Sequence, residues 1–352
     1  MTDEMIELAD IVIPLGDHLT PAIREELEAQ EYEQAELAAL RAVLNTDDMV
    51  MEIGTGLGFL SAWCARRVGS SQVFTFEANP VLEQPIRRLY ELNGVSPHLE
   101  ICVLSESAGS AVFYPQKEFW ASSILAGNGT GAGITVTARS FEEARASIRP
   151  TLLIVDIEGG ELELIRHARL DGIRHILIEL HPDVIGEEGC EAVVATLARA
   201  GFDIQPAMWG SDSVFTFERA ADGAPSAETR VPEALAELPW HRAEHALTLL
   251  LNAIPPAGAL VVLDQSLWWR GVEFGARRRH FPVERAGEEY GLPEDGGAAV
   301  AELRARRAEG ARWLAVAWPA FWWFDEFPEL LRYLEQCPEI VNTRDIRIWE
   351  LL

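Results

Sequence analysis

The sequence predicts an α/β fold, in which a doubly wound sheet is followed by a second, smaller α/β domain. Between residues 49 and 218, apolar runs of strand length alternate with segments of helical periodicity. Two of these runs, Leu152–Val155 and Ile176–Ile178, are apolar throughout, which indicates strands covered on both faces. Three glycines alternate at residues 54–58, directly after the first run, as in the turns that bind nucleotide ligands.

The length and composition indicate two domains. The chain has 352 residues, of which 48% are hydrophobic, enough for two separate cores. We expect a helical segment at residues 1–45, a ligand-binding domain at 46–220 and a small α/β domain at 233–352. Residues 221–232 contain the Ala, Gly, Ser and Pro typical of a linker.

Apolar periodicity predicts the elements of the larger domain. We expect strands at 49–53, 72–77, 99–104, 111–114, 134–138, 151–156, 174–180, 203–207 and 213–218, and helices at 57–67, 81–92, 140–147, 160–168 and 188–200. The glycine-rich loop 122–133 is either a mobile cover over the site or a surface loop without a function.

Residues 20–44 precede the first strand and predict one or two helices. Thr20 suits the N-cap and Pro21 the first helical position. Leu37, Leu40, Val43 and Leu44 form an apolar stripe. Tyr32 comes just before this stripe, and it either lies over the edge of a ligand or belongs to an exposed helix face.

Charge and segment composition exclude some functions. A formal net charge of −27 repels a phosphate backbone, so nucleic acid is not expected as a partner. The acidic start, Met1–Glu4, lacks the basic residues of a signal peptide, and Asn252 and Pro255–Pro256 interrupt the most apolar stretch. We therefore expect a cytoplasmic protein without membrane insertion. The four cysteines have no C-x-x-C spacing, so neither zinc nor disulfides are expected.

The glycine turn predicts which ligand binds. Dinucleotide-binding turns have the spacing G-x-G-x-x-G, whereas here the third glycine arrives one residue early and the strand ends in an acid, which would repel a pyrophosphate. A ligand with a cationic amino acid end and no phosphate fits better, and S-adenosylmethionine is the common one. The alternative is a helix-packing turn without a ligand. The expected cofactor-binding residues of this turn are Glu52, Gly54, Thr55, Gly56, Gly58 and Phe59.

A second acidic residue supports a nucleotide site. Glu77 ends the strand 72–77, where α/β nucleotide-binding folds hold ribose hydroxyls. We expect Ala78, beside it, and Ser105, which follows the next strand, to contact the same cofactor.

A group of acids follows the strand 151–156. Asp156 and Glu158 point to the same side because strand side chains alternate, and the two following glycines let the chain turn into a helix. Glu161 is expected to bind substrate, the alternative being an interaction with the helix dipole. His181 ends the next strand and either faces the same crevice or is structural.

These motifs together resemble the FkbM family of S-adenosylmethionine-dependent methyltransferases. The resemblance covers roughly residues 30–218 and rests on the turn 52–59, the run Glu77–Pro80, the D-x-E-G-x-E element at 156–161 and Leu177–Pro182. It implies the Rossmann-like fold of class I methyltransferases and the methylation of oxygen on small molecules, glycans or natural products. Relatives often carry Leu-Asp before the helix at 140, where this chain has Ala138–Ser140.

The smaller domain contains many aromatic residues. We expect helices at 233–252, 296–308 and 325–335 and strands at 259–264, 313–317 and 346–350. The segment Arg277–Trp323 resembles an accessory domain found beside bacterial glycosyltransferases in surface polysaccharide pathways. Its tryptophans suit sugar stacking and the run Arg277–His280 suits an anion such as a sugar-linked diphosphate. The alternatives are core packing and a solvated face.

The sequence therefore predicts a methyltransferase that acts on a hydroxyl of a small-molecule or glycan acceptor. Glu158 is the first choice for the general base, followed by Asp156 or His181. Asp156 and Glu158 could hold a divalent cation, although no metal is expected. Two other classes stay open, a non-catalytic sugar- or partner-binding protein and an NAD-dependent oxidoreductase. A homo-oligomer is also left open.

Overall fold

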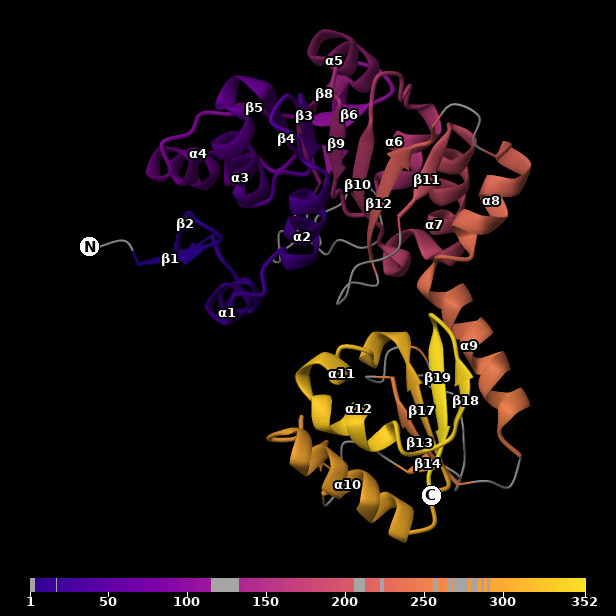
Figure 1. Ribbon diagram of the computed structural model, residues 1–352. Helices are drawn as coiled ribbons and strands as arrows, with labels where there is room; N and C mark the ends of the chain where they lie inside the picture. The colour runs from indigo at the N-terminus through magenta and orange to yellow at the C-terminus, as the bar shows by residue number, and fades with distance from the viewer. Residues whose placement is uncertain are drawn as a thin grey trace. The chain divides into compact units, whose positions relative to one another are not determined.

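The computed structural model describes residues 4–16, 18–114, 133–205, 213–221, 225–255, 259–264, 268, 278–279, 284–285, 288–289 and 292–352 (Figure 1). The chain divides into two compact units, Met1–Leu235 and Ala236–Leu352. The boundary therefore follows the expected linker 221–232 by three residues. Most of the expected loop 122–133 falls outside the described residues.

The first unit contains a seven-stranded sheet with the order β11-β12-β10-β9-β3-β4-β5. Strand β12 runs antiparallel to both of its neighbours, β10 and β11, and the other pairs of the sheet are parallel. This arrangement confirms the predicted doubly wound α/β fold. The strands are β3 (Val50–Ile53), β4 (Val73–Glu77), β5 (His98–Ile101), β9 (Leu152–Val155), β10 (His175–Glu179), β11 (Phe202–Ile204) and β12 (Val214–Arg219).

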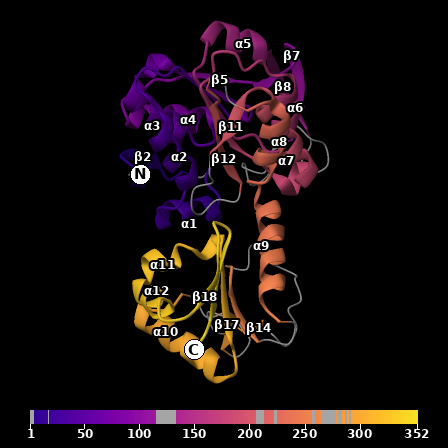
Figure 2. The ribbon, with the colours of Figure 1, turned by 45° about the vertical axis from the view of Figure 1, so that its right-hand side comes forward.

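Helices cover both faces of this sheet (Figures 1 and 2). Side chains of the helices α2, α3 and α4 share one core with residues such as Val50 and Ile154 of the sheet, while α6 and α7 follow β9 and β10 on the other face. The helices that follow the first strand are α3 (Phe59–Val68), α4 (Glu83–Leu92), α5 (Phe141–Ile148), α6 (Glu161–His167) and α7 (Pro182–Arg199). Helix α7 begins earlier than expected and is kinked at Gly186, whose φ is 74°.

The N-terminal segment contains two helices, as expected, and a hairpin that was not predicted. Strands β1 (Met5–Leu8) and β2 (Ile11–Pro14) pair in antiparallel register and precede α1 (Pro21–Ala29) and α2 (Gln34–Val43). Thr20 caps α1, since its side chain accepts a hydrogen bond from the Ile23 amide, and Pro21 is the first helical residue. Helix α1 ends at Gln30, in the left-handed region with a φ of 64°.

A separate three-stranded sheet follows β5. The expected strand 99–104 is divided, because Cys102 separates β5 from β6 (Val103–Ser105), which pairs with β8 (Ile134–Ser140) instead. Strand β7 (Gly109–Phe113) pairs with the other edge of β8. This small sheet brings Ser105 to the same edge of the unit as the end of β4.

Helix α8 (Ala227–Leu235) belongs to the first unit, although its first residues lie in the expected linker. The Arg230 guanidinium donates to Asp203 at 2.7 Å and to the carbonyls of Ala198 and Pro225. These contacts attach the helix to α7 and β11. The single helix expected at 233–252 is divided before Pro239, because proline has no amide hydrogen to continue the helix and starts α9 (Pro239–Ala253) instead.

The second unit is an α/β domain with the sheet order β14-β13-β17-β19-β18. Trp313 and Trp323 are buried in the cores of the unit, as the core-packing alternative predicted for them, and Trp349 is buried there as well. The side chains of the run Arg277–His280 lie outside the described residues. The strands are β13 (Leu260–Leu263), β14 (Arg278–Arg279), β15 (Glu284–Arg285), β16 (Glu288–Glu289), β17 (Trp313–Ala317), β18 (Glu339–Asn342) and β19 (Ile346–Glu350), and the further helices are α10 (Gly296–Ala308), α11 (Trp323–Glu326) and α12 (Pro328–Leu334).

Candidate active site

A cavity of about 810 Å³ opens at the carboxyl edge of the first unit's sheet. The parallel register aligns Ile53 with Phe76 on one side and with Val155 on the other, and Val155 with Ile178. The next residue of each strand therefore reaches the same edge, and these residues are Gly54, Glu77, Asp156 and Glu179, all of which line the cavity. In parallel α/β sheets this edge is the usual place for a ligand.

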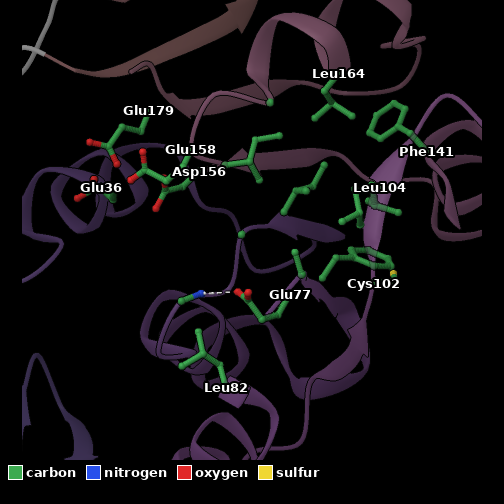
Figure 3. A pocket seen from close by; sticks show the side chains of 18 of the residues that line it. Glu36, Glu77, Leu82, Cys102, Leu104, Phe141, Asp156, Glu158, Leu164 and Glu179 are labelled. Atoms are coloured by element: carbon green, nitrogen blue, oxygen red, sulfur yellow. Dashed lines mark hydrogen bonds between the residues drawn. The ribbon is translucent and has the colours of Figure 1, made fainter. Parts of the chain in front are cut away.

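The cavity has a charged side and an apolar side (Figure 3). The carboxyl groups of Glu36, Asp156, Glu158 and Glu179 gather on one side, and Glu77 lies apart from them near the glycine turn. The opposite side carries apolar side chains, among them Leu104, Phe141 and Leu164, and Glu106, Glu142 and Glu163 line the cavity next to them in the chain. A ligand with one apolar ring and one polar, charged end matches this division.

Each of the three positions of the turn requires glycine for a different structural reason. Gly54, with a φ of 89°, passes so close to β9 that a Cβ would lie 1.6 Å from the Asp156 carbonyl oxygen. Gly58, with a φ of 84°, packs against α4, and its Cβ would lie 2.9 Å from Ile86 Cγ2. Only Gly56 lines the cavity with room above it, since the nearest atom to its Cβ would be the Tyr32 hydroxyl at 3.5 Å.

Glu77 is held by the glycine turn itself. Its Oε2 accepts hydrogen bonds from the amides of Thr55 at 3.1 Å and Gly56 at 3.0 Å, and its Oε1 accepts one from Asn79 at 2.7 Å. A carboxylate has about four acceptor positions, so these three hydrogen bonds leave about one position for a hydroxyl donor. Burial raises the pKa of Glu77 to about 7, although these amide hydrogen bonds act in the opposite direction.

Four of the residues that we expected to bind the cofactor lie behind the glycine turn and do not line the cavity. They are Glu52, Thr55, Gly58 and Phe59. The Glu52 carboxyl accepts a hydrogen bond from the Thr75 hydroxyl, which also contacts the Thr55 hydroxyl. Burial raises the pKa of Glu52 to about 8. Gly58 and Phe59 are enclosed by the helices beside the turn. These residues support the turn, whereas Gly54, Gly56, Glu77, Ala78 and Ser105 line the cavity as expected.

Tyr32 lies over the glycine turn. It is 7% exposed, lines the cavity and packs edge-on against Phe59, with ring centroids 6.1 Å apart. The neighbouring Glu33 starts α2 with a φ of 49°, and its Oε1 is 3.7 Å from the Cβ position of Gly56. The alternative of an exposed helix face is therefore wrong for Tyr32, and its contact with the edge of a ligand stays a prediction.

The acids of the charged side come from three parts of the chain. Glu36 is on α2, Asp156 and Glu158 follow β9, and Glu179 ends β10. Burial, followed by the charge of Glu179, raises the pKa of Asp156 well above its usual range and that of Glu36 to about 7. Asp156 is therefore protonated more readily than an ordinary carboxyl.

His181 contacts four carboxyl groups at once. Its Nε2 lies 3.3 Å from Glu158, 3.8 Å from Asp156 and 3.9 Å from Glu179, and its Nδ1 contacts Glu161. Burial lowers the pKa of His181, but the hydrogen bonds to Glu158 and Glu161 outweigh it and raise the pKa to about 11. An imidazolium has no lone pair to accept a proton, so this geometry does not favour His181 as a general base.

The sequence did not single out Glu36 and Glu179 as site residues. Glu179 is the last residue of β10, in the position equivalent to Glu77 on β4. Ligands of α/β sheets bind at the carboxyl ends of the strands, and this rule alone would have identified Glu179. The sequence gave a weaker indication of Glu36. It lies three residues after Glu33, and residues at this spacing lie on the same face of a helix. Glu161, expected to bind substrate, is fully buried and does not line the cavity.

Two groups bring possible metal donors together among the described residues. Asp156, Glu179 and His181 form the first, and the exposed Glu106, Glu163 and His167 form the second. A metal needs an imidazole nitrogen without its proton. Both ring nitrogens of His181 already contact carboxylates, and exposed acids often cluster without an ion. We assign a metal to neither group.

Comparison with known proteins finds a family model that matches one part of the chain. Residues 48–204 match the model of the methyltransferase FkbM domain. Similar solved structures include the methyltransferase FkbM from Methylobacillus flagellatus KT (12% identity, 58% of this chain and 55% of that chain, TM-score 0.33) and M. jannaschii TYW2 in complex with AdoMet (11% identity, 62% and 87%, TM-score 0.33). A putative O-methyltransferase from Klebsiella pneumoniae is also similar (15% identity, 59% and 84%, TM-score 0.33). No curated protein matches the chain.

The strand order, with one antiparallel strand beside the end of the sheet, and the glycine turn with Glu77 define a class I methyltransferase fold whose cofactor is S-adenosylmethionine. Residues 48–204 are a methyltransferase domain of the FkbM family. No helix in the described ranges is long and apolar enough to cross a membrane.

Proposed function

We propose that this protein transfers a methyl group from S-adenosylmethionine to a hydroxyl group of a small-molecule or glycan acceptor. The observation that carries the proposal is the alignment of four strand ends around one cavity: Glu77 stands at one end of this row, the glycine turn comes next, and the acids Asp156, Glu158 and Glu179 follow. The same cavity would thus bind the cofactor at the glycine turn and the hydroxyl groups of an acceptor at the neighbouring carboxyl groups.

The residues that would hold the cofactor are those of the turn and its neighbours. Glu77 would accept hydrogen bonds from the ribose hydroxyls, and the backbone at Gly56 leaves room for a ligand to cross the turn. The apolar side chains on the far side of Glu77, such as Leu82 and Leu104, suit the adenine ring. The bound cofactor supplies an electrophilic methyl group on a positively charged sulfur.

Glu158 is the proposed general base. A carboxylate that stabilised the positive sulfur would favour the ground state over the transition state, so the acids serve the acceptor instead. Asp156, which retains its proton more readily, would donate a hydrogen bond to the acceptor, and Glu158 would accept the proton of the reacting hydroxyl. The remaining acceleration would come from holding the acceptor oxygen in line with the methyl group.

The charges around the cavity narrow the acceptor class. Among the described residues that line it there are eleven Asp and Glu side chains and no Lys or Arg. A phosphorylated acceptor would be repelled at this wall, whereas neutral hydroxyl groups match carboxylates as hydrogen-bond donors. The proposed acceptor is therefore an uncharged sugar or natural-product group.

Labelled-methyl transfer tests the proposal. The protein is incubated with S-adenosylmethionine that carries a labelled methyl group and with panels of neutral sugars, glycolipids and natural products, and mass spectrometry detects a product that has gained one methyl. Thermal-shift curves with S-adenosylhomocysteine, with NAD and without ligand separate a methyltransferase from an oxidoreductase and from a non-catalytic binder. Stabilisation by NAD alone would contradict the proposal.

The Glu158→Gln variant tests the assigned base. Methyl transfer should fall by about 100-fold or more, because general-base catalysis contributes roughly 100- to 10,000-fold. Binding of S-adenosylhomocysteine should stay within a few-fold of the wild type. Glu187→Gln, an exposed position on α7 outside the cavity, is the matched control. If Glu158→Gln transferred methyl within a few-fold of the wild type while binding the cofactor, Glu158 would not be the base.

A further inference from the structure

The imidazole of His181 lies one layer behind the cavity wall. Asp156, Glu158 and Glu179 line the cavity, whereas His181 and Glu161 do not. The His181 side chain is 13% exposed and that of Glu161 is fully buried. His181 therefore does not touch a ligand in the cavity, and any effect that it has on the reaction passes through the carboxyl groups that it contacts.

The four carboxyl groups around His181 depend on its charge. Within the described part of the chain, every ion pair of Asp156, Glu158, Glu161 and Glu179 is with His181. Glu179 also accepts a hydrogen bond from the Ser213 hydroxyl at 2.9 Å. Glu36 on α2 adds a further negative charge that acts on the same imidazole. Glu161 is fully buried and the other three carboxyl groups are partly exposed, and this many like charges close together repel one another without a positive partner.

Among the four carboxyl groups, that of Glu161 depends most strongly on the charge of His181. Its Oε1 contacts the His181 ring and the Gly159 amide, the latter at 3.3 Å, while its Oε2 is buried without a hydrogen-bond partner among the described residues. Burial raises the pKa of Glu161, and its hydrogen bond to His181 acts in the opposite direction, so the charged form of Glu161 depends on an adjacent positive group. His181 is that group, and Glu161 in turn fixes the orientation of the ring.

We propose that His181 is a positioning residue: its ring is clamped between Glu161 and Glu158, and its positive charge holds the Glu158 carboxyl group in place at the cavity wall, facing the acceptor. The Nδ1 hydrogen is donated to Glu161 and the Nε2 hydrogen to Glu158, so both ring nitrogens are donors. This inference rests on the proposed function for the role of Glu158, but the state of His181 can be measured without an acceptor.

Nuclear magnetic resonance of the wild-type protein tests the charge directly. With ¹⁵N-labelled histidine, one of the eight histidines should keep both ring protons up to at least pH 9, and its signals should be absent from the His181→Gln spectrum. If every histidine lost its charge below pH 8, the inference would be overturned. This result is independent of methyl transfer, so it separates a failure of the inference from a failure of the proposed function.

The effect on Glu158 is tested with ¹³C-labelled glutamate carboxyl groups. The Glu158 signal is assigned by its loss in Glu158→Gln, and its titration midpoint should move up by about one pH unit or more in His181→Gln, because a nearby positive charge favours the ionised carboxyl. His181→Lys, which restores a positive charge, should move the midpoint back. An unchanged midpoint in His181→Gln would contradict the proposal.

The matched control is His175→Gln. His175 is a buried histidine on the same strand, β10, and its Nε2 lies 3.8 Å from Glu218, away from the cavity. Its replacement should leave the Glu158 titration at the wild-type value. If His181→Gln does not fold, His181→Lys is compared with the wild type instead to test the charge role. The lysine charge should hold the titration midpoint of Glu158 within about half a pH unit of the wild-type value. A larger upward shift would overturn the charge role.

Discussion

The Glu77 carboxylate accepts a hydrogen bond from the Gly56 amide at 3.0 Å, and so joins the end of β4 to the glycine turn that follows β3. The same oxygen accepts from the Thr55 amide, and the other oxygen from Asn79. The Glu77 side chain thus fixes the backbone of the glycine turn and also presents a hydrogen-bond acceptor to the cavity. Its loss should disturb both the cofactor site and the fold around it.

Glu77→Gln should weaken the binding of S-adenosylhomocysteine by about tenfold or more. The amide group of glutamine presents a donor where two backbone amides already donate, and a lost hydrogen bond to a charged group costs about 1.5–3 kcal/mol. Isothermal titration calorimetry measures the change. Glu83→Gln, on the exposed face of α4, should bind as the wild type does. An unchanged affinity in Glu77→Gln would exclude Glu77 from the ribose site.

Gly58→Ala should destabilise the fold, whereas Gly56→Ala should mainly weaken cofactor binding. A Cβ at Gly58 would press on Ile86 and Tyr90, whereas a Cβ at Gly56 would meet no atom closer than 3.5 Å. Strained backbone and overpacking each cost roughly 1–3 kcal/mol. Urea unfolding and calorimetry measure the two effects.

Gly69→Ala is the control for backbone strain at the other end of α3. Gly69 has a φ of 97°, but a Cβ there would find open space. The free energy of unfolding should therefore fall further in Gly58→Ala than in Gly69→Ala. Equal losses would mean that contact with α4 contributes nothing to the requirement for glycine at position 58.

Stability should fall as pH rises from about 5 to 8. The folded-state pKa of Glu52 is about 8, above its ordinary value of 4.5, so between these values the folded protein binds more protons than the unfolded chain. The free energy of unfolding then decreases with pH, for one such group by at most about 1.4 kcal/mol per pH unit. Glu36 and Glu77, with pKa values of about 7, act in the same direction.

Glu52→Gln should make this pH dependence shallower, because the amide does not titrate. Urea unfolding at pH 5, 6, 7 and 8 compares the slopes, and the exposed Glu91→Gln on α4 serves as the control. Identical slopes in Glu52→Gln and the wild type would show that Glu52 is ionised at neutral pH in the folded protein.

Methyl transfer should persist in excess EDTA. The imidazole nitrogens that a metal would need already contact the carboxyl groups of Glu158 and Glu161. Rates are compared before and after dialysis against the chelator, with Mg²⁺ and Mn²⁺ added back. Loss of activity that one of these ions restores would place a metal among the acids of the cavity.

Local patterns were sufficient for the main elements. Periodicity predicted β17, β19 and α10 to the residue. Because ligands bind at the carboxyl ends of parallel strands, we expected Glu52, Glu77 and Asp156 at one edge of the sheet, and Glu77 and Asp156 do line the cavity there, whereas Glu52 does not. Both results depend on short-range facts, the alternation of side chains and the common direction of parallel strands. The division of the expected strand 99–104 was missed, because it depends on the pairing of β6 with β8, some 35 residues later in the chain.

The sequence by itself determined the kind of sheet, the glycine turn and the set of acids at its edge, since each is encoded within a few neighbouring residues. Only the tertiary structure decided that Glu52 lies behind the turn, that Glu36 joins the cavity from α2, and that His181 lies between Glu158 and Glu161. The direction of a side chain and the charge that it carries depend on burial by distant segments, which no local pattern contains.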